Sequence, residues 1–138
     1  MSRLQPLSFI FSRSDPDFRT TVIQVSCDPY IEHAFIQTPL YDSITGDKIG
    51  YKVGDDYVQQ VGPQEYIVRA SITYVLDGLG TITWFASYTN TEPSFLYPLN
   101  TPIVSTILSG TGTYYGSQGT VRLVAMEDGT RDVQITFV

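Results

Sequence analysis

The sequence predicts an all-β protein, folded as a single eight-stranded antiparallel barrel with a short N-terminal arm. Three observations carry this prediction. No segment of ten or more residues has the hydrophobic period of an amphipathic helix, which argues against a parallel α/β sheet with its crossover helices. Short runs rich in β-branched and aromatic residues alternate instead with turn residues. A glycine-rich stretch at 107–123 is typical of a sharp barrel corner.

The arm is expected at 1–19 and the barrel at 20–138. Pro6, Pro16 and the polar run 12–15 indicate a strap that could serve as a lid, and not a strand. The eight expected strands follow in order: 20–27, 33–41, 48–61, 65–76, 80–90, 102–109, 119–127 and 131–138. Most connections are hairpin-like, because residues that tolerate a left-handed or fixed backbone separate the runs, as at Asp77-Gly78 and Asp128-Gly129.

Four glycines punctuate the stretch 107–123, namely Gly110, Gly112, Gly116 and Gly119. A glycine cluster can also bind phosphate through backbone amides at the start of a helix. Here no Gly-Lys-Ser/Thr sequence follows, and the next residues are rich in β-branched types without a helical period. We therefore interpret the stretch as a structural turn.

The alternation of apolar and polar residues predicts which side chains face the barrel interior, since successive residues of a strand point to opposite faces. In the strands at 65–76 and 80–90 the apolar residues occupy even positions. The stretch 102–108 is apolar on both faces and is compatible with a fully buried strand, a bulge or a subunit interface. The residues expected inside are Ile49, Tyr51, Val53, Asp55 and Tyr57, then Tyr66, Val68, Ala70, Ile72, Tyr74 and Leu76, then Ile82, Trp84, Ala86 and Tyr88, and finally Val121, Leu123, Ala125, Val133, Ile135 and Phe137.

Composition limits the range of partners. The net charge of −6 and the scattered Lys and Arg residues give no basic surface for nucleic acid. No apolar run is long enough to span a membrane, and the N-terminus lacks the apolar core of a signal peptide, so we expect a soluble, cytoplasmic protein.

Cys27 is the sole cysteine, which excludes an internal disulfide, and we expect it to be a buried small hydrophobic residue. One His and one Cys give poor support for a metal site, and no metal or other cofactor is expected.

The predicted interior is unusually rich in amphipathic rings. Buried Tyr and Trp need partners for their polar tips, so such an interior is typical of a cavity that orients an apolar guest. The alternative is that the rings simply fill the barrel. The candidate wall residues are Tyr66, Tyr74, Trp84, Tyr88 and Leu123, and the candidate catalytic or orienting residues are Tyr51, Asp55 and Tyr57.

Two acidic residues have alternative interpretations. Asp55 could act as a general base whose pKa is raised by burial, or it could mark a bulge or a solvated strand end beside Gly54. Glu32 and His33 are adjacent on a strand and therefore face opposite sides, so they are not expected to act together on one substrate.

Over residues 32–138 the chain resembles the allene oxide cyclase and dirigent barrel superfamily. The resemblance rests on Leu40-Tyr41 followed by Thr45-Gly46-Asp47-Lys48-Ile49-Gly50, on the strand pair around Asp77-Gly78, and on the glycine stretch 107–123. It implies the eight-stranded barrel, and it says little about activity because these positions are mostly turns.

The residues that carry the two plant activities are not matched. Where dirigent proteins have an acidic pair and arginines, this chain has Gln37-Thr38, Tyr115 and Gln118. Asp56 replaces the second-strand cysteine of the cyclases, and the alternation places Asp56 outside the barrel. Their early glutamate corresponds only loosely to Glu32.

In length, free N-terminal arm and turn motifs the chain is closest in type to small spirotetronate-type polyketide cyclases. That resemblance implies a Diels–Alderase-like role in natural-product biosynthesis, in which an apolar conjugated substrate is folded in the cavity for an intramolecular four-plus-two cyclisation without a cofactor. We expect this activity. The alternatives are a hydrophobic-ligand carrier and a non-catalytic structural or interaction protein built on a filled oligomeric barrel. The sequence is compatible with a homo-oligomer, dimer or trimer.

Overall fold

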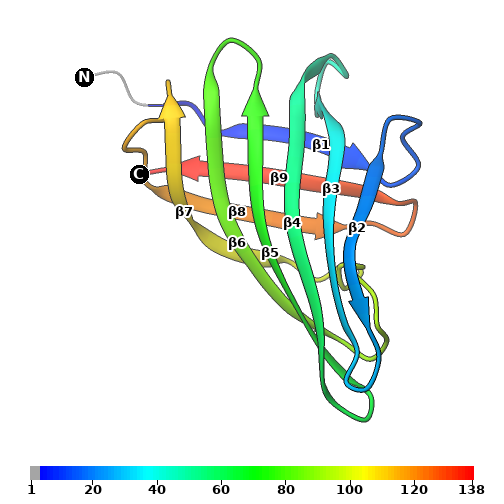
Figure 1. Cartoon of the computed structure of the whole chain (residues 1–138). Coiled ribbons are helices and arrows are strands. Elements are labelled where there is room, and N and C mark those ends of the chain that lie inside the picture. Colours follow the sequence, from blue (N-terminus) through cyan, green and yellow to red (C-terminus); the bar gives the residue numbers. More distant parts are fainter. Residues whose placement is uncertain (1–3) are drawn as a thin grey trace.

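A computed structural model describes residues 4–138, which form nine antiparallel strands (Figure 1). No helix among these residues is long and apolar enough to cross a membrane. The strands are β1 (Leu7–Ser12), β2 (Arg19–Ser26), β3 (Ile31–Asp42), β4 (Lys48–Gly62), β5 (Glu65–Leu76), β6 (Gly80–Asn90), β7 (Ile103–Gly112), β8 (Gly119–Ala125) and β9 (Thr130–Phe137).

The sheet closes on itself. Its strand order is β1-β9-β8-β7-β6-β5-β4-β3-β2, and β1 also pairs with β3. Eight strands, β1 and β3 to β9, therefore complete a ring, while β2 lies outside it and pairs with β3 alone. The predicted eight-stranded antiparallel barrel is confirmed, with one extra strand.

The first barrel strand lies earlier in the chain than the sequence indicated. Residues Leu7–Ser12 pair with β9 from Leu7 opposite Ile135 to Ser12 opposite Thr130, and Phe9 and Phe11 are buried. The expectation that this part of the N-terminal segment is an arm and not a strand is wrong. Large apolar residues at every second position complete the core here, directly after Pro6, where a strand can begin.

The inward faces of four strands are as predicted. The even residues of β5 from Val68 to Leu76 are buried, as are the predicted residues of β6 and β8 and, on β9, Val133 and Ile135. Tyr66 and Phe137, near the strand ends, are only partly buried. Clear alternation of apolar and polar side chains was a reliable guide where the interior holds only apolar residues.

The face of β4 is opposite to the prediction. Its register places Gly50, Lys52, Gly54, Asp56 and Val58 opposite the buried even residues of β5. Ile49 is partly buried, and the other predicted residues point outward, so that Tyr51, Val53 and Tyr57 are exposed and Asp55 is half-buried. The alternation gave the wrong face because Tyr51, Val53 and Tyr57 lie on the outer surface, whereas the inner positions before Val58 carry only glycines and two charged residues.

Strand β7 carries apolar side chains on both faces, as the sequence indicated. The structure shows which of them are buried and which are exposed. Ile103 is buried, whereas Val104 and Leu108 are each 57% exposed on the outer surface. The pairing of β7 with β6 ends at Trp84 opposite Ile107, although β6 continues to Asn90. The barrel wall therefore opens on this side, and the connection 91–102 crosses the opening (Figure 1).

The glycine stretch forms the hairpin between β7 and β8, which confirms the structural turn. Gly112 and Gly116 have φ angles of 62° and 71°, the left-handed region that glycine favours. At Gly119 a Cβ would lie 2.1 Å from the carbonyl oxygen of Thr136 on the neighbouring strand. Only glycine allows the two backbones to approach so closely.

Candidate functional site

A cavity of about 300 Å³ lies between the inner faces of β1, β3, β4 and β9 and the β6–β7 connection. Apolar and charged side chains share its wall. The lining residues are Phe11, Arg13, Phe18, Thr20, Glu32, Ile36, Lys52, Asp56, Pro93, Ser94, Phe95, Leu96, Tyr97 and Arg131. This cavity is the candidate site because three of the charged residues, Lys52, Asp56 and Arg131, are almost completely buried.

Lys52 occupies the floor of the cavity. It is 2% exposed, its Nζ donates a hydrogen bond to the Tyr97 hydroxyl at 3.2 Å, and the same atom lies 4.7 Å from the centre of the Phe11 ring. The Tyr97 hydroxyl accepts only one of its three N–H groups. Thr38, opposite Lys52 on β3, is fully buried, and its hydroxyl has no hydrogen-bond partner among the residues that the structure describes.

Asp56 lies on the same face of β4, two inward positions further along. It is 2% exposed, and no group in the described part of the chain forms a hydrogen bond with its Oδ1. Its cross-strand neighbours Ala34 and Ala70 are small, and Gly54 separates it from Lys52. These three small residues leave room for both charged side chains in the interior.

Arg131 is the second cation of the site. It comes from the inner face of β9 and is 3% exposed; its Nη1 donates a hydrogen bond to the Gly129 carbonyl oxygen at 2.6 Å. The guanidinium carbon lies 5.7 Å from the centre of the Tyr97 ring, and Lys52 Nζ lies 5.6 Å from the same centre. Tyr97 is thus in contact with both cations.

Burial shifts the proton affinities of these groups. Loss of hydration lowers the pKa of Lys52 to about 8, partly opposed by the nearby Asp56 carboxylate. Burial raises the pKa of Asp56 to about 6, again opposed by Lys52. Burial also lowers the pKa of Arg131 and raises that of Tyr97, so Tyr97 is a neutral phenol that can both donate and accept. An acid and a base that both titrate near neutral pH are suited to proton transfer.

The β6–β7 connection is held over the cavity by side chains of β6. The Tyr88 hydroxyl donates to the Phe95 carbonyl oxygen at 2.5 Å, and Asn90 donates to the carbonyl oxygens of Ser94 and Leu96. The rings of Tyr88 and Tyr97 lie 5.1 Å apart. These contacts place Tyr97 in the interior although it belongs to a loop.

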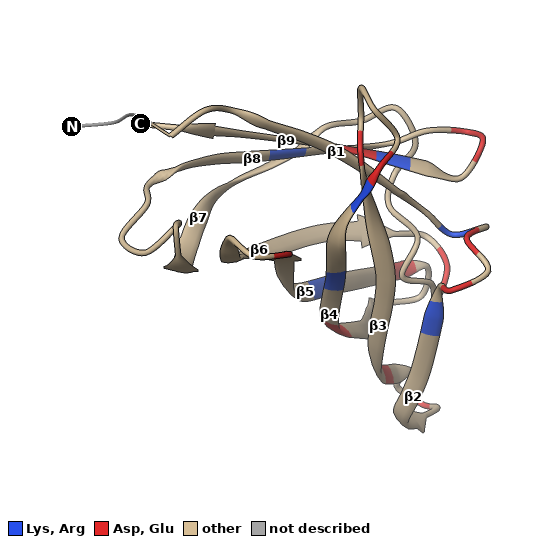
Figure 2. Cartoon of the chain, turned by 90° about the horizontal axis from the view of Figure 1, so that it is seen from above, with Lys and Arg blue, Asp and Glu red and all other residues tan. Residues whose placement is uncertain are grey.

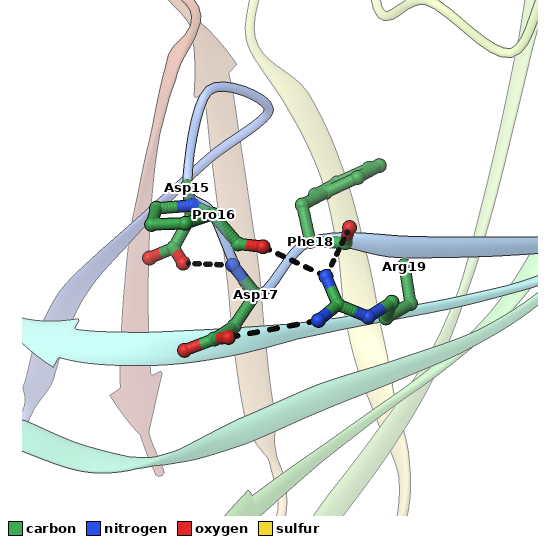
Figure 3. Close-up of polar contacts among 5 residues, drawn as sticks. All are labelled: Asp15, Pro16, Asp17, Phe18 and Arg19. Carbon is green, nitrogen blue, oxygen red and sulfur yellow. Dashed lines mark hydrogen bonds and ion pairs between the residues drawn. The ribbon is translucent and has the colours of Figure 1, made fainter.

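The turn between β1 and β2 forms another wall of the cavity (Figure 3). Arg19 donates to the Pro16 carbonyl oxygen at 2.7 Å and pairs with Asp17 at 3.7 Å, and the Asp17 amide donates to the Asp15 carboxylate at 2.8 Å. The ring of Phe18 points away from this polar cluster, and Phe18 lines the cavity. The predicted arm therefore contributes to the site through this turn.

The predicted wall residues lie in three different surroundings. Tyr74, Trp84 and Leu123 are fully buried core residues and are not among those that line the cavity. Tyr88 reaches the site indirectly, through its hydrogen bond to the β6–β7 connection. Tyr66 is partly buried beside Tyr30 and lines a separate hollow near the start of β5 and the end of β6.

The predicted orienting residues lie on the outer surface. Tyr57 stacks on His33, with ring centres 4.1 Å apart, and His33 Nε2 lies 2.5 Å from Asp55 Oδ1. Asp55 and Tyr57 line a hollow on the outside of β4, β5 and β6, and Tyr51 is 36% exposed. Glu32 and His33 lie on opposite faces as expected, since Glu32 lines the cavity. Cys27 is exposed, so the expectation of burial is wrong.

Sequence reasoning missed four residues of the site, Lys52, Asp56, Tyr97 and Arg131. Lys52 and Asp56 are four positions apart on one strand, with Gly54 between them, and this spacing places them on one face. The sequence therefore indicates that Lys52 and Asp56 share a face, but the alternation predicts that this face is the outer one. No alternation could have placed Tyr97, because it lies in a connection.

The described residues contain no group of three or more His, Cys, Asp and Glu side chains that could hold a metal ion. The other Lys and Arg residues are spread over separate strands and turns (Figure 2). The polar side chains that line the cavity supply ammonium, guanidinium, carboxyl, phenol and hydroxyl groups.

Fold and site together define a closed antiparallel barrel with a cavity that is apolar over much of its wall and charged at its floor. No family model matches the chain, and no curated protein matches it. Among solved structures, that of pyocyanin demethylase is similar, with a TM-score of 0.64 and 18% identity over 97% of this chain and 100% of the other. At this identity the likeness shows a shared fold, and that fold occurs in a protein named as an enzyme.

Proposed function

We propose that this chain is a cofactor-independent barrel enzyme of the allene oxide cyclase and dirigent-like type, closest to the small polyketide cyclases. It would bind one partly apolar, conjugated molecule in the cavity and promote an intramolecular cyclisation. The observation that carries the proposal is a buried ammonium group, on Lys52, with unused N–H donors inside a largely apolar cavity.

Such a donor has a defined use in ring closure. A hydrogen bond from Lys52 to a carbonyl oxygen of the substrate withdraws electrons from the adjacent double bond, and the effect is strong where water is excluded. The apolar walls, including Phe11 and Ile36, would hold the reacting carbons close together and remove rotational freedom before the reaction. No nucleophile or metal is required.

Activity is best tested as an isomerisation, because an intramolecular cyclisation leaves the molecular mass of the substrate unchanged. The purified chain is incubated with fractions of a metabolite extract from the source cells, and products of unchanged mass and shifted retention are followed by chromatography and mass spectrometry. Lys52→Met should abolish the conversion, whereas Lys48→Met, an exposed residue of the same strand, should retain it. Equal conversion by both variants would refute the role of Lys52.

A ligand carrier is the second candidate. It is favoured by the β6–β7 connection, which Tyr88 and Asn90 fasten over the cavity and which would retain a bound molecule. A molecule that co-purifies with the chain and is recovered unchanged after prolonged incubation supports the carrier. Recovery of an isomer supports the enzyme.

A further inference from the structure

We infer that the ligand of the cavity carries a carboxylate, which binds between Lys52 and Arg131 with the apolar body of the ligand against the surrounding rings. This inference rests on the proposed binding of a small molecule in the cavity. It is independent of whether the bound molecule reacts.

The buried charges that line the cavity are not balanced. Lys52 and Arg131 are both almost completely buried, and Asp56 is the one buried carboxylate that lines the cavity with them. Within the part of the chain that the structure describes, neither cation forms an ion pair within 4.0 Å. Buried charges in proteins are normally paired, because an isolated one is strongly destabilising. Arg13 and Glu32 also line the cavity and offset each other, so the cavity has an excess of one positive charge that an anion would balance.

Both buried cations have N–H donors that no group of the described residues accepts. Among residues 4–138, Lys52 makes one side-chain hydrogen bond, to Tyr97, and Arg131 makes one, to the Gly129 carbonyl oxygen. A guanidinium group has five N–H donors in one plane, and two of them match the two oxygens of a carboxylate. The cations come from β4 and β9, on different parts of the barrel wall, so an anion between them would be held from two sides.

The apolar part of the cavity wall suits the remainder of the ligand. Phe11, Ile36, Phe95 and Leu96 line the same cavity and offer carbon surface only. The volume of about 300 Å³ is at the lower end for small-molecule sites. A flat, conjugated acid with one carboxylate fits these walls and the single excess charge. Asp56 would repel a second anionic group, which favours a monoacid over a diacid.

The test compares three ligands of the same shape by isothermal titration with the full chain, namely naphthalene carboxylate, naphthalene carboxamide and naphthalene amidine. We expect the carboxylate to bind at least about tenfold more tightly than the carboxamide, and the amidine more weakly than both. Arg131→Met should reduce carboxylate affinity by about tenfold or more and leave carboxamide affinity nearly unchanged. Arg122→Met, an exposed arginine on β8, is the matched control and should alter neither.

The outcomes separate this inference from the function on which it rests. Equal affinities for carboxylate and carboxamide overturn the anion site while binding in the cavity stands. If none of the three ligands binds, both the inference and the proposed binding function fail. If circular dichroism shows that Arg131→Met does not fold, Arg131→Lys takes its place. This variant keeps the positive charge but loses the paired N–H donors. Undiminished carboxylate affinity in Arg131→Lys would overturn the two-sided arrangement.

Discussion

The side chains of Lys52 and Asp56 both lie over Gly54 on the inner face of β4. A Cβ at position 54 would lie 2.8 Å from Asp56 Oδ1 and 3.5 Å from Lys52 Cε. The two charged side chains thus occupy the space that any larger residue would fill. Their arrangement in the cavity depends on this glycine, which makes no polar side-chain contact itself.

Gly54→Ala is therefore expected to disturb the site more than the fold. The added methyl group displaces the Asp56 carboxylate, a movable group, so the free energy of unfolding should change by less than about 1 kcal/mol. Binding of naphthalene carboxylate should change at least severalfold. Gly62→Ala, at the end of the same strand against the Glu65 side chain, is the control and should leave binding unchanged. Identical binding by both variants would contradict the dependence of the pair on Gly54.

The stability of the protein should rise with pH above about 8. In the unfolded chain the pKa of Lys52 returns to 10.5, whereas in the folded chain it is about 8. Between these values the unfolded chain binds more protons, so the free energy of unfolding increases with pH. Asp56, whose pKa is about 6, is ionised throughout that range. Above pH 10 the raised pKa of Tyr97 has the opposite effect, because the unfolded tyrosine ionises first.

Urea titrations at about pH 8 and pH 9.5 measure this effect. The expected gain is about 1–2 kcal/mol, since each unit of pKa difference is equivalent to about 1.4 kcal/mol. In Lys52→Met this gain should disappear. A variant with the same pH dependence as the natural chain would show that another group is responsible.

Replacing both members of the buried pair should stabilise the fold. Buried charges in well-packed interiors are often less favourable than apolar residues of similar volume, and the double replacement commonly gains about 1–4 kcal/mol. We expect Lys52→Met with Asp56→Val to raise the melting temperature and to lose ligand binding. Asp56→Val alone should be less stable than the double variant, because it leaves Lys52 and Arg131 buried without a carboxylate. Additive effects of the two single variants would argue against coupling between them.

The sequence revealed the fold more clearly than the site, for a physical reason. Strands β5 and β6 were assigned correctly because their inner positions are apolar and their outer positions carry Ser, Thr and Arg. On β4 the same rule fails, since Tyr51 and Tyr57 are exposed while Lys52 and Asp56 are buried. A binding site is where an interior departs from the apolar rule, so alternation is least reliable there.

Two other residues of the site depend on contacts distant in sequence. Tyr97 enters the interior because Tyr88 fastens its loop. Arg131 follows a turn, where a charged residue is usually solvated. Neither position has a local pattern that distinguishes a buried side chain from an exposed one.

The close backbone approach at Gly119 gives a prediction for stability. In Gly119→Ala the new Cβ would lie 2.1 Å from the Thr136 carbonyl oxygen, so β8 and β9 must separate locally. We expect a loss of about 2–3 kcal/mol or more in the free energy of unfolding. Gly116→Ala is the control, since nothing lies within 4 Å of the added carbon and only its φ of 71° is unfavourable, at about 1–2 kcal/mol. Equal losses would show that backbone conformation alone requires glycine at both positions.

Trp84→Ala should mainly affect packing. Trp84 is fully buried and does not line the cavity, so truncation should cost about 3–5 kcal/mol by denaturant titration. Tyr97→Phe, which removes the hydroxyl that accepts from Lys52, should weaken ligand binding with a much smaller loss of stability. If Trp84→Ala instead weakened binding while the fold kept its stability, the cavity would extend further into the barrel than its present walls.

The pairing of β1 with β9 has a consequence for biosynthesis. The ring closes between residues near the two ends of the described chain, such as Leu7 and Ile135, while β3 to β6 are successive hairpins. During translation those hairpins can form as they leave the ribosome, but closure must await the synthesis of Thr130–Phe137. Contacts so distant in sequence form late. Until β9 has been made, Phe9 and Phe11 lack the β9 neighbours that bury them, so the nascent chain is vulnerable to aggregation during this interval.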